Sequence, residues 1–156
     1  MKYQYYLIVI FLVTLIASYY LGYTPILVSM LFLVASGVAY LAYAKDKASA
    51  KSGDWRVSEN TLHIISVFCG WPGAIIAQEK LRHKTKKTSF RIAFWITVAI
   101  NLFGFFWVHT DEGRNELRNA VFQIENFTIS NVHSRSIVST VLWFTEFRGD
   151  ESHQFR

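Results

Sequence analysis

The sequence predicts an all-α polytopic membrane protein: three transmembrane helices, a broken apolar segment between the second and the last of them that re-enters the membrane, and a small C-terminal tail. Three observations support this fold class. Apolar residues make up 52% of the 156 residues. They form runs close to the roughly 17–25 residues that a helix needs to cross a bilayer. Lys- and Arg-rich stretches flank the shortest run, which is interrupted by Gly70-Trp71-Pro72-Gly73.

The first two spans are expected to form a helical hairpin. The first covers about residues 5–21, and tyrosines at both of its ends suit the two membrane interfaces. Its start resembles a signal peptide, but no small-x-small cleavage site follows, so we expect an uncleaved anchor. Residues 22–25 form an uncharged turn, and Pro25 suits the start of the second span, residues 26–44. Small residues such as Ala35, Ser36 and Gly37 permit close helix packing there.

The third apolar segment, residues 62–77, follows a polar stretch over 45–60 in which Ser58 or Asn60 suits a helix cap. It would reach only about 24 Å as an unbroken helix, less than a hydrocarbon core of roughly 30 Å. Pro72 lacks an N–H and clashes with the carbonyl four residues back, so the pattern predicts a kinked or broken helix.

The last span covers residues 90–108, which makes 1–108 the membrane domain and 109–156 an extramembrane tail. Leu117, Ala120, Val121 and Ile124 share one face of a helix at the start of the tail. Residues 136–147 are rich in β-branched and aromatic side chains, so helix and strand both stay open there.

Charge distinguishes two topologies. If all four apolar segments cross, Lys and Arg near the spans number seven inside and six outside. If residues 62–77 re-enter instead, eleven lie inside, and both basic stretches share the cytoplasm with the N-terminus. The positive-inside rule favours the second topology, although proline-kinked spans also exist.

Re-entry would gather cations into one cytoplasmic surface, here called the basic rim. Such a surface attracts lipid headgroups, phosphate or nucleic acid. Glu59 and His63 are four residues apart on a helix, and Arg56 precedes Glu59 by three, so the spacing allows a chain from guanidinium to carboxylate to imidazole. The plain alternative is that these charges only mark topology and anchor helices. The predicted anion-binding residues are Lys45, Lys47, Arg56, Arg82, His83, Lys84, Lys86 and Lys87, with Asp46, Glu59 and His63 as polar support.

Several classes of site have no signature. The sequence contains no phosphate-binding glycine loop, nucleophile elbow or zinc-protease helix, and it predicts no cofactor and no metal site. The lone Cys69 cannot form an internal disulfide. No charged residue lies deep in the first, second or last span, which argues against a pump.

The middle of the chain carries a set of residues in a specific order and spacing: Tyr43-Ala44-Lys45-Asp46-Lys47, Arg56, Glu59, Leu62-His63, Gly70-Trp71-Pro72-Gly73-Ala74, Gln78, His83-Lys84-Thr85-Lys86-Lys87 and Phe90. With these residues the stretch from about Ala42 to Trp95 resembles a family of small bacterial membrane proteins of unknown function, some of which carry a cold-shock domain ahead of the membrane part. Ser58 departs from a usual proline, Cys69 from a common glycine and Lys86 from a usual arginine. The resemblance implies the bacterial inner membrane and a cytoplasmic N-terminus, and the missing cold-shock domain puts direct nucleic-acid binding in doubt.

Three functions stay open at this point. The first is a binding module whose basic rim captures an anionic lipid, a phosphate or a nucleic-acid backbone. The second is a membrane enzyme acting on a lipid or prenyl phosphate, with Glu59 and His63 as acid and base. The third is a structural or assembly partner that packs its small-residue helix faces against another membrane protein or a second copy of itself.

Overall fold

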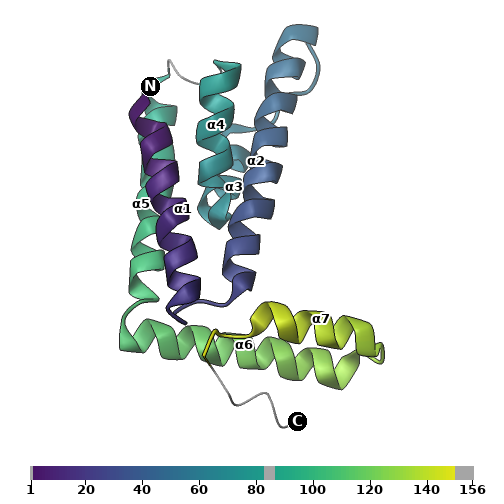
Figure 1. Ribbon diagram of the computed structural model, residues 1–156. Coiled ribbons are helices and arrows are strands. Elements are labelled where there is room, and N and C mark those ends of the chain that lie inside the picture. The colour runs from purple at the N-terminus through teal and green to yellow at the C-terminus, as the bar shows by residue number, and fades with distance from the viewer. Residues whose placement is uncertain (1, 83–86, 150–156) are drawn as a thin grey trace. The chain divides into compact units, whose positions relative to one another are not determined.

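The protein is represented by a computed structural model that describes residues 2–82 and 87–149. Every regular element in these ranges is helical, as Figure 1 shows, which confirms the predicted all-α class. The elements are α1 (Lys2–Tyr20), α2 (Ile26–Ser52), α3 (Glu59–Ile65), the π-helical turn η1 (Ser66–Gly70), α4 (Trp71–Leu81), α5 (Thr88–Trp107), α6 (Asp111–Asn131) and α7 (Arg135–Thr145).

Four helical stretches are long and apolar enough to cross a membrane: Tyr3–Tyr20, Ile26–Ser52, Glu59–Leu81 and Thr88–Trp107. The second differs from the expected span, because α2 continues past residue 44 to Ser52. Alanine and lysine, which are good helix formers, dominate this extension. The helix ends at Gly53, whose positive φ of 78° suits glycine and whose N–H donates to the Ser49 carbonyl.

The chain forms two compact units. Unit 1 comprises residues 1–11 and 31–103, and unit 2 comprises residues 12–30 and 104–156, each within the described ranges. The core of unit 1 surrounds Trp71, whose side chain is fully buried. The Phe11 ring packs edge-on against Trp71 at a centroid distance of 5.0 Å and against Phe32 at 4.8 Å.

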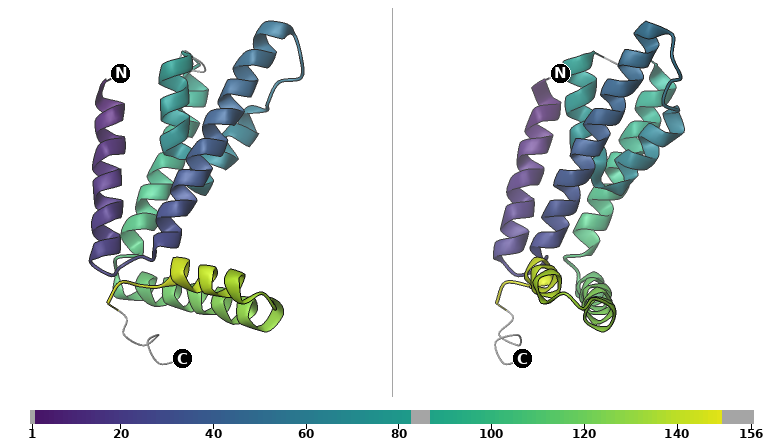
Figure 2. Two further views of the ribbon diagram at one scale, coloured as in Figure 1. Left: turned by 45° about the vertical axis from the view of Figure 1, so that its right-hand side comes forward. Right: turned by 90° about the vertical axis from the view of Figure 1, so that its right-hand side faces the viewer.

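Within unit 1 the chain reverses direction between α3 and α4 (Figures 1 and 2). Before α3, Arg56 contacts Asp46 near the end of α2. At the turn, Gly73 lies against Ser36, near the middle of α2. At the end of α4, the Leu81 carbonyl accepts a hydrogen bond from Lys47. The helices α3 and α4 therefore form a hairpin whose two open ends lie beside the end of α2.

The bend of this hairpin interrupts the helix at Phe68 (φ −84°, ψ 60°) and Cys69 (φ 64°, ψ 3°). The predicted break is thus present, but it precedes Pro72 by three residues. Pro72 lies in the first turn of α4, where its missing N–H removes no helical hydrogen bond. Proline therefore starts the returning helix, and the irregular backbone falls just before it.

Two features hold the bend in place. A Cβ atom on Gly73 would lie 1.9 Å from the Ser36 carbonyl oxygen, so only glycine allows this approach of α4 to α2. From α5, the buried Asn101 donates its Nδ2 to the carbonyls of Ser66 at 3.1 Å and Val67 at 2.9 Å. Asn101 thus satisfies backbone oxygens next to the irregular segment, where hydrocarbon offers no water to do so.

Unit 2 holds the α1–α2 turn against the end of α5 through a buried polar cluster. The His109 Nδ1 donates to the Phe105 carbonyl at 2.8 Å, which leaves Nε2 to accept from the Ser18 hydroxyl at 3.0 Å. Ser18 also bonds the Thr24 hydroxyl at 2.9 Å. Unit 2 continues with the antiparallel hairpin α6–α7, joined where the Thr145 hydroxyl donates to the Glu125 carboxylate at 2.6 Å. This settles as helical the tail segment that the sequence left open.

The close approach at Gly73 generates a stability prediction. Replacing Gly73 with Ala should lower the free energy of unfolding by about 1–3 kcal/mol, because the added Cβ overlaps the backbone at Ser36. Gly37→Ala is the matched control, since its Cβ would meet nothing within 4 Å. SDS-induced unfolding in mixed micelles measures both, and equal stabilities would contradict the packing.

Asn101 generates a second prediction. Asn101→Leu should cost about 1–3 kcal/mol in unfolding free energy, because the carbonyls of Ser66 and Val67 lose a donor in a region without water. Asn119→Leu is the control, since Asn119 is exposed on α6. The same unfolding measurement applies, and a neutral Asn101 substitution would show that the bend does not need this amide.

Candidate basic rim

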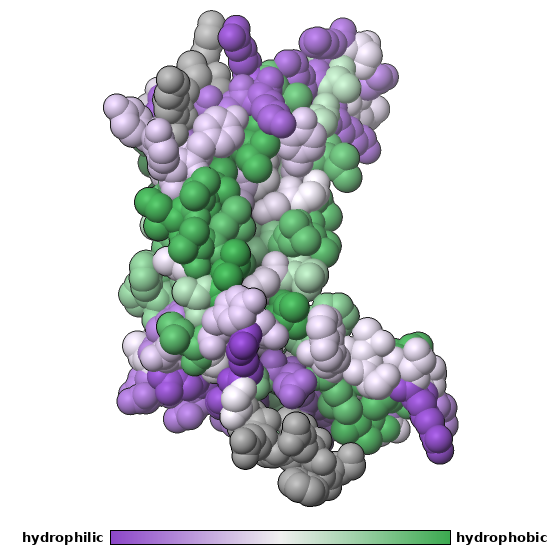
Figure 3. Space-filling model, in the orientation of Figure 1, coloured by the Kyte–Doolittle hydropathy of each residue, from purple (hydrophilic) through white to green (hydrophobic). Residues whose placement is uncertain are grey.

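The open ends of the α3–α4 hairpin, the end of α2 and the start of α5 meet at one end of unit 1. In Figure 3 hydrophilic residues gather at this end, and hydrophobic residues cover the helices below it. Five of the predicted cations are described there. Lys45, Arg56, Arg82 and Lys87 are exposed, and Lys47 is half-buried. His83, Lys84 and Lys86 fall outside the described residues.

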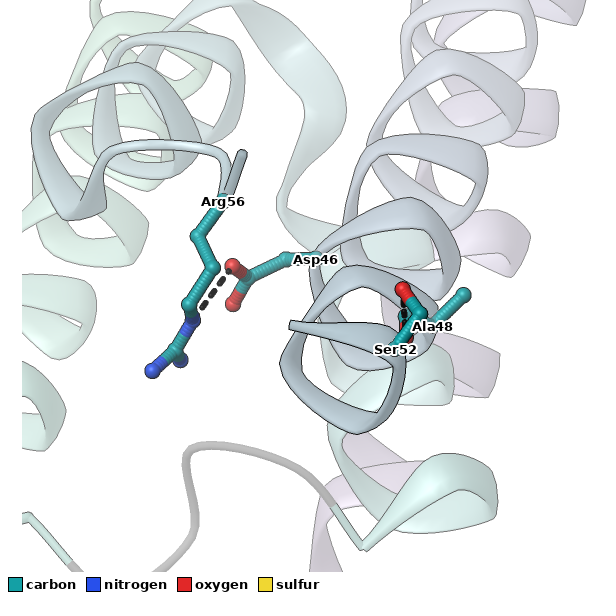
Figure 4. Close-up of polar contacts among 4 residues, drawn as sticks. All are labelled: Asp46, Ala48, Ser52 and Arg56. Carbon is teal, nitrogen blue, oxygen red and sulfur yellow. Dashed lines mark hydrogen bonds and ion pairs between the residues drawn. The ribbon is translucent and has the colours of Figure 1, made fainter. Parts of the chain in front are cut away.

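Asp46 and Arg56 form the centre of this surface. Asp46 is fully buried, and its Oδ1 lies 3.4 Å from Nε of Arg56, whose side chain is 52% exposed. Figure 4 shows that the two side chains point toward one another from α2 and from the loop before α3. The terminal nitrogens of Arg56 point away from Asp46. The carboxylate therefore orients the guanidinium through Nε and leaves the rest of its fork for another acceptor.

Two further contacts tie the segments together. Lys87, just before α5, donates to the Glu59 carboxylate at the start of α3 at 2.7 Å. Lys47 donates to the carbonyl of Leu81, near the end of α4. Arg82 ends α4 in a left-handed conformation with φ of 48°, and its N–H bonds the carbonyls of Gln78 and Glu79. At the meeting point of four segments, Lys47 thus satisfies a carbonyl at the C-terminus of α4, and Lys87 pairs with a carboxylate.

Arg56 has a different partner from the one that the sequence spacing allows. The spacing allows a pair with Glu59, and in the described part of the chain Arg56 pairs with Asp46. The sequence offered Ser58 or Asn60 as the helix cap, and α3 begins at Glu59 with Ser58 as its cap. The Ser58 hydroxyl accepts from the Thr61 N–H at 3.0 Å. Arg56 therefore lies in the preceding loop, from which it reaches α2 instead.

An aromatic layer lies beneath the rim. The His63 ring packs against Phe90 at a centroid distance of 4.4 Å, and Phe90 lies 6.2 Å from Tyr43. Gln78 Nε2 donates to the Tyr43 hydroxyl at 3.3 Å, which pairs two polar groups within the core. These contacts join α2, α3, α4 and α5 directly below the charged groups, so well-packed side chains hold the helix ends that carry the rim.

Two exposed rim cations, Lys45 and Arg82, can offer their charge to a ligand. Within residues 2–82 and 87–149, no ion pair or side-chain hydrogen bond involves Lys45 or Arg82. Chemically, the surface offers ammonium and guanidinium groups as donors for an anion. Sequence reasoning missed Asn101, which supports this arrangement from below. Its signal was a lone amide in the middle of a 20-residue apolar helix.

Comparisons with known proteins cover this same region. Residues 36–90 match the profile of a family described as "Protein of unknown function (DUF1294)". The chain is also similar to "Uncharacterized protein YsdA" of Bacillus subtilis (strain 168), with 39% identity over 46 residues. That alignment covers 30% of this chain and 52% of YsdA, so the chain spans about half the length of this relative. No solved structure matches the chain. The region similar to a family of unknown function thus extends from the small-residue part of α2 to the start of α5, and it includes the rim and the bend.

Proposed function

We propose that this chain is an inner-membrane protein whose basic rim faces the cytosol and binds the phosphate of an anionic lipid headgroup. In this proposal residues 59–81 enter the membrane from the cytosol and return to it. One observation carries the proposal: residues from both basic stretches meet at one end of unit 1. The contacts concerned are those of Arg56 with Asp46, Lys47 with Leu81 and Lys87 with Glu59.

The charge balance supports the cytosolic assignment. Residues 45–91 contain ten Lys and Arg against four Asp and Glu. If both basic stretches lie on the cytosolic side, both loops that carry this excess obey the positive-inside rule. The start of α1 lies at the same end of unit 1 in both views of Figure 2, which adds the N-terminus to that side.

The position of the rim favours a lipid phosphate over other anions. Its cations follow directly on apolar helices, at the level where headgroups lie. Each Lys or Arg near an anionic leaflet contributes about 1 kcal/mol of attraction. Arg56 is already oriented by Asp46, and a preorganised guanidinium fork matches phosphate geometry. A rim that only marks topology would instead attract every anionic surface without selecting a headgroup.

The topology prediction uses single cysteines in a chain whose native Cys69 is replaced with Gly, which suits the positive φ there. We expect cysteines at Ser52 and Thr88 to react with a membrane-impermeant maleimide only after the cytosolic side is opened. A cysteine at Ser134 should react from the outside. If Thr88→Cys were labelled in sealed cells, the α3–α4 segment would cross the membrane and the proposed rim would be divided between two sides.

The ligand prediction uses native mass spectrometry of the detergent-solubilised protein with phosphatidylglycerol or phosphatidylcholine. We expect phosphatidylglycerol to bind more tightly. The double variant Lys45→Gln and Arg82→Gln should weaken its binding on the order of tenfold, because two cations are lost and the rim ion pairs stay intact.

The matched control removes the same charge outside the rim, through Arg135→Gln and Arg148→Gln, both exposed in unit 2. It should leave lipid binding unchanged. Titration with inorganic phosphate separates a free-phosphate site from a headgroup site. Equal loss in both double variants would mean that net charge alone attracts the lipid.

A further inference from the structure

Helix α6 presents an apolar stripe that extends beyond its contacts within unit 2. Residues 113, 117, 120, 124 and 127 follow one another at intervals of four and three, so they share one face of the helix. They are Gly113, Leu117, Ala120, Ile124 and Phe127. Their exposure rises along the helix: Gly113 is buried, Leu117 is half-buried, and Ile124 and Phe127 are 45% and 69% exposed.

Helix α7 carries a second apolar stripe, formed by Ile137, Val141 and Phe144 at intervals of four and three. Ile137 is 53% exposed. The helices run antiparallel and meet at Glu125 and Thr145. Successive residues are about 100° apart around a helix axis. On each helix the stripe therefore lies roughly a quarter turn away from the edge where the two helices meet, and the turn has the same direction on both helices. Because the helices are antiparallel, both stripes face the same side of the α6–α7 hairpin.

The stripe on α6 begins at the end of a candidate membrane span. A Cβ atom on Gly113 would lie 2.1 Å from the carbonyl oxygen of Trp107, the last residue of α5. Thr110 caps α6, and its hydroxyl accepts from the Gly113 N–H at 3.2 Å. Three residues thus separate the span from a helix whose first turn packs on the span itself. The face of α6 that starts on Trp107 continues outward as Ile124 and Phe127.

The rest of the exposed surface of α6 is mainly polar, although Phe122 and Ile129 are also exposed there. Its exposed polar side chains are Glu112, Asn115, Glu116, Asn119, Gln123 and Asn126. A hydrophobic area is visible on the hairpin in Figure 3. A helix with an uncharged apolar stripe and a mainly polar remaining surface, joined directly to a membrane span, has the pattern of an element that lies in the membrane–water interface.

From this geometry we infer that the α6–α7 hairpin is an interfacial membrane anchor, and that the surface it binds is the lipid bilayer itself. Ile124, Phe127 and Ile137 insert at the boundary between headgroups and acyl chains. A second protein is disfavoured as the occupant of the stripes, because only three large apolar side chains on them are strongly exposed, far fewer than the roughly 20–30 residues a side of a stable interface. The stripes carry no charge, so this binding needs no anionic lipid and is independent of the basic rim.

The experiment uses the full chain with Cys69→Gly, reconstituted in phosphatidylcholine vesicles, with one spin-labelled cysteine at a time. Phe127→Cys and Phe122→Cys form the matched pair. Both residues are exposed phenylalanines on α6, 69% and 58%, but Phe122 lies outside the stripe. Ile124→Cys and Ile137→Cys extend the stripe, and Asn119→Cys is the polar control. Collisions with oxygen report lipid, and collisions with a neutral nickel chelate report water.

At positions 124, 127 and 137 we expect an oxygen-to-nickel collision ratio several-fold higher than at positions 119 and 122. The same pattern should persist after phosphatidylglycerol is added, whatever the rim binds. Nickel-dominated collisions at all five positions would overturn the inference, because the hairpin would then lie in water. Labels at 124 and 127 shielded from both reagents would also overturn it, because a protein surface would then cover the stripe.

Discussion

Backbone polar groups inside a bilayer must find partners within the protein, and the bend between α3 and α4 is where this chain meets that constraint. The helix is interrupted at Phe68 and Cys69, so the local backbone is irregular at the point farthest from the rim. Asn101 supplies donors to neighbouring carbonyls, and Gly73 lets α2 approach closely enough to enclose the turn. The arrangement of the four chain segments at the rim depends on this turn.

The rim and the bend lie at opposite ends of the α3–α4 hairpin. Because the chain reverses, the start of α3 and the end of α4 return to the end of α2. There Lys47 and Lys87 bond to groups on other segments, so part of the positive charge serves to hold the segments together. Arg56 is only partly engaged: Asp46 holds its Nε, while its terminal nitrogens point away from Asp46. An anion that bound there would meet donors already fixed by the fold.

Hydrophobic run length and helix-breaking residues made the helices and the break predictable, because both depend on local sequence. The extension of α2 through Lys45, Asp46 and Lys47 was missed, since polarity was taken as the end of the helix although these residues and the alanines around them sustain one. Among the site residues, Arg56 lies in the loop before α3, and its pairing with Asp46 on α2 depends on how that loop folds back. The role of Asn101 depends on a contact 35 residues away in sequence, which no local pattern reveals.

The distance along the chain between Asn101 and the carbonyls it serves has a consequence for biogenesis. Residues 66 and 67 leave the ribosome well before residue 101 does. Until α5 is made and packs on the bend, these oxygens lack the amide that bonds them in the finished protein. The bend therefore gains this hydrogen-bond donor only when the last span is present, and a chain truncated before α5 would lack it.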